Sequence, residues 1–130
     1  MRTSVLMMVT ALVYGAYGLG FLFFPSTFIA LYGGEIGSIG AFTTQLYASM
    51  LLGVAVICWL AKDAPRTEAF MAILLGLFVA MTLVTIVVAV NQFSSETVKS
   101  WAWMPWTIQV LMAAGFGYAR FGPDPDRPRD

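Results

Sequence analysis

The sequence contains no histidine and only one cysteine, Cys58. Without imidazole, the chain offers no histidine ligand for haem, chlorophyll or zinc. A single cysteine cannot form an intrachain disulfide or a two-thiol redox centre. We therefore predict no catalytic residue, no metal ligand and no cofactor held by this chain's own chemistry, although a bound lipid or quinone is compatible with it.

Charged residues are also scarce. They make up 11% of the 130 residues, whereas 59% are hydrophobic. One water-soluble core cannot bury so much apolar surface, so the composition predicts a membrane protein. The net charge is zero and no nucleic-acid motif is present, so we expect no nucleic-acid partner.

The charges leave four uncharged stretches, near residues 4–24, 41–61, 69–91 and 102–119. Each is close to the roughly 20 apolar residues that cross a bilayer as a helix. Helices are required because an open strand would leave backbone groups unpaired in hydrocarbon. The predicted fold is all-α: one domain over residues 1–121, a polytopic bundle of four transmembrane helices, and a polar tail over residues 122–130.

The basic residues predict the orientation of these spans. Four spans place six basic residues on one side and one on the other, namely Arg2, Lys62, Arg66, Arg120, Arg127 and Arg129 against Lys99. Because basic residues stay on the cytoplasmic side, both termini and the tail are predicted to be cytoplasmic, in a bacterial inner membrane. The first span is long and lacks a small-residue cleavage site, so we expect it to remain as an anchor.

The segment "FLFFPSTFIALYGG", residues 21–34, contains a break. Pro25 lacks a backbone donor and disfavours helix in the residue before it, so the first span should end near Phe24. Residues 25–34 then predict a short helix ended by its two glycines. This helix would either cover the mouth of the bundle or rest in lipid at the outer interface. An ordered apolar loop packed on the helix ends is the alternative.

Small residues recur at four-residue spacing in three spans. This spacing lets helices approach closely in lipid, either within the chain or between chains. The predicted packing residues are Ser49 with Gly53, Ala72 with Gly76 and Ala80, and Gly115 with Ala119.

Polar side chains gather in the outer half of the predicted spans. Tyr14 and Tyr17 are neighbours on one helix, Gln45 and Ser49 share a face of the next span, and Gln109 lies in the last. These five residues are candidates to line a ligand pocket that opens outwards. The alternative, which we favour, is that polar side chains form hydrogen bonds between helices.

The order of these features along the chain is similar to that in a known group of membrane proteins. A first span ending in "GLGFLFFP", a half-helix closing in "LYGG" and a second span opening with "TTQLYASMLLG" resemble the small four-helix membrane proteins of the DoxX-like and related uncharacterised families. The resemblance covers nearly the whole chain and implies a bacterial inner-membrane four-helix bundle. It transfers no catalytic residue, because the thiol or cofactor chemistry attributed to one such protein has no matching residues here.

Three classes of function fit these features. We favour a non-catalytic accessory or scaffolding subunit of a larger membrane complex, because the chain has small-residue faces and short loops. The second class is a bundle that binds a small molecule, lipid or quinone. The third is a small channel or transporter built from several copies. The expected partners are membrane lipid and either other membrane subunits or further copies of this chain.

Overall fold

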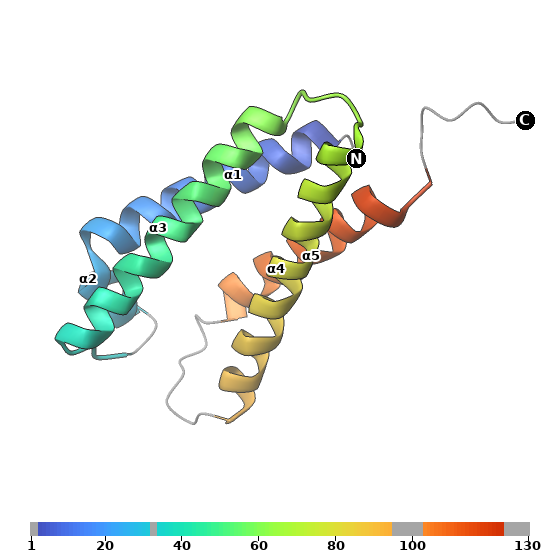
Figure 1. The fold of residues 1–130 in the computed structure, drawn as a ribbon. Helices are drawn as coiled ribbons and strands as arrows, with labels where there is room; N and C mark the ends of the chain where they lie inside the picture. Colours follow the sequence, from blue (N-terminus) through green and yellow to red (C-terminus); the bar gives the residue numbers. More distant parts are fainter. Residues whose placement is uncertain (1–2, 32–33, 95–102, 124–130) are drawn as a thin grey trace, which may run out of the picture.

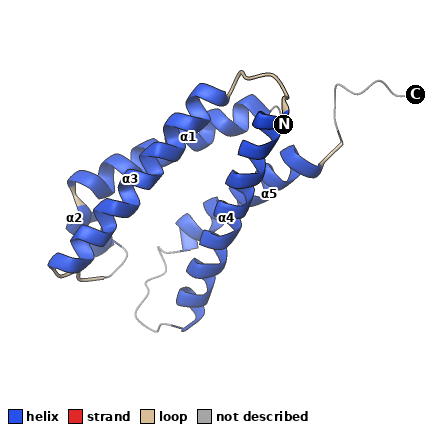
Figure 2. Ribbon diagram, viewed as in Figure 1, coloured by secondary structure: helices blue, strands red, loops and turns tan. Residues whose placement is uncertain are grey.

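A computed structural model describes residues 3–31, 34–94 and 103–123, with the backbone alone for residues 91–94. Within these residues the protein consists of helices and connecting loops, without strands (Figure 2). The helices are α1 (Thr3–Phe23), α2 (Pro25–Leu31), α3 (Ser38–Ala61), α4 (Glu68–Ser94) and α5 (Trp103–Phe121) (Figure 1). The all-α prediction is therefore confirmed.

Three of the helices are long and apolar enough to cross a membrane. They are α1, α3 and the Glu68–Val90 part of α4. This result supports the predicted membrane location and three of the predicted spans. The helix α5 is not among them, so its role as a fourth span stays a prediction, and the first residue of that predicted span, 102, lies outside the described residues.

The break at Pro25 lies where the sequence places it. The helix α1 ends at Phe23, and Pro25 is the first residue of α2. Phe24 still donates its backbone N–H to the Gly20 carbonyl at 2.9 Å, so the chain turns without losing that hydrogen bond. After α2, the Gly34 N–H donates to the Ile29 carbonyl at 3.2 Å, which closes the helix end. The prediction of two separate elements is confirmed.

The long helices form two antiparallel hairpins. The first consists of α1 and α3, the second of α4 and α5, and contact between the hairpins is chiefly that of α1 with α5. Figure 1 shows the hairpins close together near the N-terminus and spread apart at their other end. The predicted closed bundle is therefore not confirmed, because the hairpins meet over only part of their length.

The core lies in the half of the molecule where the hairpins meet. The largest of its fully buried side chains come from all four long helices: Met7, Thr10, Cys58, Leu74, Met81 and Phe116. Close packing of these groups holds the hairpins together, because a dense interior gains many dispersion contacts. The opposite half has no comparable core among the described residues, and this is where a cleft opens.

Charged side chains mark the end of the molecule where the hairpins meet, which we call the basic end. Ser4 Oγ, at the start of α1, donates a hydrogen bond to Asp63 at 3.2 Å, and Lys62 pairs with the same carboxylate at 3.1 Å. The hydrogen bond from Lys62 is the main cause that lowers the pKa of Asp63. Arg66 reaches the last turn of α5, where its guanidinium donates to the Ala119 carbonyl at 2.7 Å. The start of α1, the 62–67 loop and the end of α5 therefore lie together.

The 62–67 loop caps the start of α4. Thr67 directly precedes the helix, and its hydroxyl accepts a hydrogen bond from the Phe70 N–H at 3.2 Å. This is an N-cap, which satisfies one of the unpaired donors of the first turn. Glu68 begins the helix, where a negative charge is favourable.

The short helix α2 packs on the first hairpin. The Phe28 ring lies so close to Gly20 of α1 that an added Cβ there would overlap it. The ring of Phe28 also stands 5.2 Å from that of Phe21. One side of α2 is therefore in contact with α1, while Leu31 on the other side is exposed. The interpretation of residues 25–34 as an interfacial helix fits this arrangement, although Tyr32 and Gly33 lie outside the described residues.

Candidate functional site

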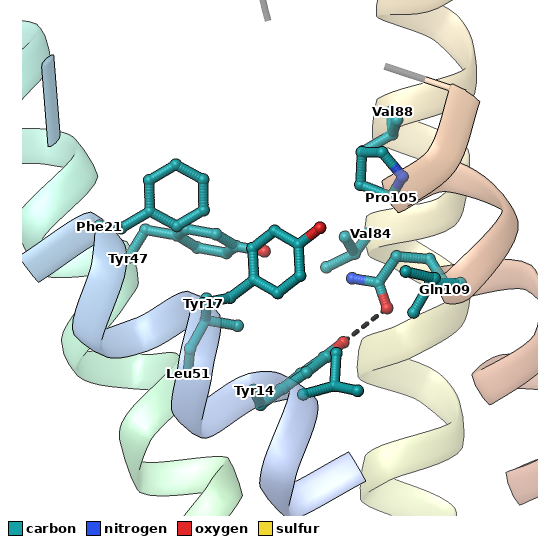
Figure 3. Close-up of a pocket in the computed structure, with 11 residues that line it drawn as sticks. Tyr14, Tyr17, Phe21, Tyr47, Leu51, Val84, Val88, Pro105 and Gln109 are labelled. Atoms are coloured by element: carbon teal, nitrogen blue, oxygen red, sulfur yellow. Dashed lines mark hydrogen bonds between the residues drawn. The ribbon is translucent and has the colours of Figure 1, made fainter. Parts of the chain in front are cut away.

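A cleft of about 190 Å³ lies between the two hairpins, in the half where they spread apart (Figure 3). Its walls are almost entirely apolar. The first hairpin contributes Val13, Tyr14, Tyr17, Phe21, Tyr47 and Leu51, and the second contributes Val84, Val88, Pro105, Ile108 and Gln109. No residue of α2 lines the cleft, so the described part of residues 25–34 gives no support to the alternative in which this segment covers the mouth of the bundle.

The floor of the cleft carries one hydrogen bond between the hairpins. The Tyr14 hydroxyl of α1 donates to Gln109 Oε1 of α5 at 2.5 Å (Figure 3). It also lies 2.6 Å from Met81 Sδ of α4, but a carbonyl oxygen is a much stronger acceptor than a thioether. Both Tyr14 and Gln109 are buried, so each needs a partner. This hydrogen bond therefore fixes the orientation of the Gln109 amide.

The orientation of Gln109 determines what the cleft offers to a guest. Because Oε1 accepts from Tyr14, the amide nitrogen, which carries two donors, points towards the first hairpin (Figure 3). In the same view the Tyr17 hydroxyl points from the first hairpin towards the second. The Gln109 amide thus presents hydrogen-bond donors in an otherwise apolar cavity.

An aromatic cluster forms the wall of the cleft nearest α2. Phe21 is its centre: its ring lies 6.0 Å from that of Tyr17 and 6.3 Å from that of Tyr47. These separations fall in the range preferred by interacting aromatic rings. Together with Phe28 of α2, the cluster fixes the positions of Tyr17 and Tyr47. The wall is therefore well ordered before any guest enters.

The structure brings together three of the five predicted site residues. Tyr14, Tyr17 and Gln109 all line the cleft. Gln45 does not: it is exposed, and its Nε2 donates to the Leu22 carbonyl of α1 at 3.1 Å. Ser49 is exposed as well, and its hydroxyl donates to the Gln45 carbonyl of its own helix at 2.9 Å. The predicted polar face of α3 is thus outside the cleft.

Serine and threonine hydroxyls bond within their own helices, so the presence of a polar side chain alone does not predict a pocket residue. Seven of them donate to the carbonyl four residues earlier in their own helix, at 2.8 to 2.9 Å: Thr10, Thr43, Thr44, Ser49, Thr82, Thr85 and Thr107. Such bonds satisfy the hydroxyl without any neighbour. These residues therefore neither join helices nor need a ligand, whereas Tyr14, Gln45 and Gln109 do join helices.

The predicted packing residues divide into two groups. Gly115 lies against α1, since an added Cβ would be 2.9 Å from Leu6 Cδ1, and Ala119 is buried. The others, Ser49, Gly53, Ala72, Gly76 and Ala80, are exposed. An added Cβ at Gly53 or Gly76 would meet nothing within 4 Å. Among the described residues, these faces of α3 and α4 make no close contact at those two glycines.

The other lining residues were not predicted as a site. Phe21 and Leu51 lie four residues from Tyr17 and Tyr47, and Val84 and Val88 are four residues apart on α4. This spacing places each pair on one face of its helix. The spacing was a usable signal, but every apolar span contains many such pairs. Sequence alone offers no means of choosing which faces meet.

Comparison with known proteins gives no relative. The chain matches no protein-family model, no curated protein and no solved structure. The site therefore has to be interpreted from its own geometry. Among the described residues, no three His, Cys, Asp or Glu side chains gather closely enough to hold a metal ion.

Proposed function

We propose that this protein is an integral membrane protein that binds a mainly apolar small molecule, such as a lipid or a quinone, in the cleft between its hairpins. One observation carries the proposal: the hydrogen bond from Tyr14 turns the Gln109 amide donors into an apolar cavity. Small-molecule sites have this character, with mostly hydrophobic walls and a few polar groups that set orientation. The proposal assigns the protein binding without a chemical step.

The donors specify the part of the guest that would bind deepest. An amide NH2 suits an acceptor oxygen, such as the carbonyl of a quinone or the ester of a lipid. The aromatic wall around Phe21 suits a flat ring or an acyl chain. A guest of this kind would place its carbonyl at Gln109 and its apolar part towards the spread end of the hairpins.

Replacement of Gln109 by leucine tests the proposal. The change removes the donors at similar side-chain size, so a carbonyl guest would lose one hydrogen bond and bind about tenfold more weakly. Affinity is measured by thermal shift of the purified protein during titration with a quinone that has a short alkyl tail. Extraction of the wild-type protein and mass spectrometry of the extract identify any lipid or quinone that it retains.

Gln45→Leu is the matched control, because Gln45 also joins α3 to α1 but lies outside the cleft. Both variants should lose about 1 kcal/mol of stability, since each leaves a hydrogen-bond partner unpaired. Only Gln109→Leu should weaken the quinone. Equal affinity in the two variants would refute the site while leaving the fold intact.

The same proposal places four spans in a bacterial inner membrane, with α5 as the fourth and both termini in the cytoplasm. The 19 residues of α5 carry no charge before Arg120, and the helix packs against α4. At about 1.5 Å per residue, this length approaches the hydrocarbon thickness. The basic end would then face the cytoplasm. The resemblance to DoxX-like proteins belongs to this part of the proposal.

Cysteine labelling tests the topology. In a Cys58→Ser background, Glu35→Cys should react with a membrane-impermeant maleimide in intact cells, whereas Ala64→Cys should react only after permeabilisation. Both positions are exposed and lie at opposite ends of α3. The reverse pattern of labelling would invert the orientation, and labelling of both from outside would contradict a single span between the two positions.

A second candidate is the accessory or scaffolding subunit. It is favoured by the exposed small residues Ala72, Gly76 and Ala80 on α4, which would let a helix of another membrane protein or of a second copy approach closely. Co-purification under mild detergent tests this candidate. A stable complex, or an oligomer of this chain, would support it.

A further inference from the structure

A groove of about 400 Å³ lies at the basic end, on the side of the second hairpin away from the cleft residues. Two arginines line it, Arg66 before α4 and Arg120 in the last turn of α5, together with the carboxylate of Glu68. The charged residues of the groove therefore carry one net positive charge. Its floor is apolar and consists of Met71, Ala72 and Leu75.

The two arginines are held in place by α5. Arg66 donates to the Ala119 carbonyl at 2.7 Å, which anchors its guanidinium at the end of that helix. The Arg120 guanidinium lies 5.1 Å from the centre of the Phe121 ring, and its Nε is shielded from solvent without a hydrogen-bond partner among the described residues. Two guanidinium groups on one groove suit an anionic oxygen, because a guanidinium group forms charge-assisted hydrogen bonds with such an oxygen.

The apolar floor continues along α4 away from the charges. Leu75, Val79 and Leu83 follow at four-residue intervals and are 38%, 46% and 58% exposed. Beside them run the small residues Ala72, Gly76 and Ala80, which are also exposed. A ridge of larger side chains next to a strip of small ones forms a shallow path along the helix. This path begins at Ala72, which also lines the groove.

We propose that this groove is a binding site for an anionic phospholipid, with its phosphate at Arg66 and Arg120 and one acyl chain along the small-residue strip of α4. The groove combines what such a lipid requires: a positive site at the end of an apolar helix and an exposed apolar path that continues from it. Juxtamembrane arginines attract anionic headgroups. A free phosphate would use the charges but not the path.

The site is independent of the cleft, because the two share no lining residue. It lies at a membrane boundary whichever way the chain is inserted, since both arginines flank the ends of α4 and α5. If the cleft binds no quinone or lipid, the groove can still bind a phospholipid. If the groove binds no phospholipid, the proposal for the cleft is unaffected.

Native mass spectrometry of the full chain in a neutral detergent tests the inference. Phosphatidylglycerol and phosphatidylcholine with the same acyl chains are titrated separately, and the fraction of protein carrying one lipid is measured. Phosphatidylglycerol should bind the wild type more tightly. Arg120→Gln should weaken it about fivefold and the double variant Arg66→Gln/Arg120→Gln about 25-fold, in line with the attraction expected per basic residue. Arg120→Lys should retain most of the binding.

Lys62→Gln is the matched control, because Lys62 also lies at the basic end but pairs with Asp63 outside the groove. This variant should bind phosphatidylglycerol as the wild type does. Glycerol phosphate, which lacks acyl chains, should not displace the lipid at equal concentration.

Three binding results would overturn the inference: equal binding of the two lipids, unchanged binding in Arg120→Gln, or equal competition by glycerol phosphate, which would indicate a soluble phosphate ligand. A second copy or another subunit that occupies the strip and excludes lipid would also overturn it. If the double variant fails to fold, Arg120→Gln alone still decides, because it leaves intact the hydrogen bond by which Arg66 joins α5.

Discussion

Replacement of Val84 by tryptophan should abolish binding in the cleft. Val84 lies on the α4 wall of a cavity of about 190 Å³, facing the hydroxyl of Tyr17 across the space (Figure 3). An indole at this position would occupy the volume that a ring or acyl chain needs. The fold should tolerate the change, because the new atoms enter existing space and need not displace a packed core. The thermal shift caused by the short-tailed quinone should disappear. If the quinone stabilises the wild-type protein by about 3 kcal/mol, the loss of this stabilisation corresponds to at least a hundredfold loss of affinity.

Leu83→Trp is the control for this experiment. Leu83 is the neighbouring residue on α4 and is 58% exposed on the outer surface of the hairpin. Its replacement adds the same ring away from the cleft, so quinone binding should stay at the wild-type level. If Val84→Trp still binds the quinone, the guest sits elsewhere, and the cleft has no role in binding.

Replacement of Gly18 by leucine should cause a large loss of stability. A Cβ at Gly18 would be 2.7 Å from Leu52 Cγ and 3.2 Å from the Ala48 backbone carbonyl. A backbone atom cannot move aside as a side-chain end can, so the larger side chain would force α1 and α3 apart. We expect a loss of about 3 kcal/mol, at the upper end for overpacked sites. Thermal unfolding in detergent, followed by circular dichroism, measures it.

Gly76→Leu is the matched control on α4. An added Cβ there would meet nothing within 4 Å among the described residues, so the change should leave stability within about 0.5 kcal/mol of the wild type. The oligomer mass is measured on the same samples. An equal loss in the two variants would show that Gly18 is not a close contact. A fall in oligomer mass with Gly76→Leu would support the accessory-subunit candidate.

The helices were predictable because local chemistry decides them. Uncharged stretches of about 20 residues must be helical in lipid, and Pro25 must interrupt the first helix wherever its partners lie. The observed bounds of α1 and α2 therefore agree with the prediction closely. Thr67 is also positioned by local chemistry, because its capping role depends on the residues that follow it.

The pairing of helix faces was not predictable in this way. Four-residue spacing of small residues selected Gly76, where an added Cβ would meet nothing, and passed over Gly18, which lies against α3. Both are glycines in apolar helices, and only the arrangement of the whole chain distinguishes them. Sequence reasoning succeeded for Gly115 because one of several equivalent candidates happened to face α1.

Polarity identified three of the residues that line the cleft, Tyr14, Tyr17 and Gln109, but it also selected Gln45 and Ser49, which do not line it. Tyr14 and Gln109 carry groups that their own helix cannot satisfy, so a partner or ligand was a sound expectation. Ser49 carries a hydroxyl that bonds the preceding turn, so the same reasoning failed there. Side-chain length separates these cases, because a short hydroxyl can bond its own helix whereas a tyrosine or glutamine can reach another helix. Gln45 also reaches another helix but does not line the cleft, so length identifies contact between helices and not the site itself.

The spread of the hairpins has a mechanical consequence in a bilayer. The two hairpins are packed together at the basic end and separated at the other (Figure 1). In the proposed four-span arrangement, the protein would therefore occupy unequal areas in the two leaflets. Bringing the hairpins together would reduce its area in one leaflet and leave the other unchanged. Lateral pressure and lipid shape would therefore favour either a wide or a narrow separation of the hairpins. A ligand in the cleft would shift the same equilibrium, because it binds one separation better than the other.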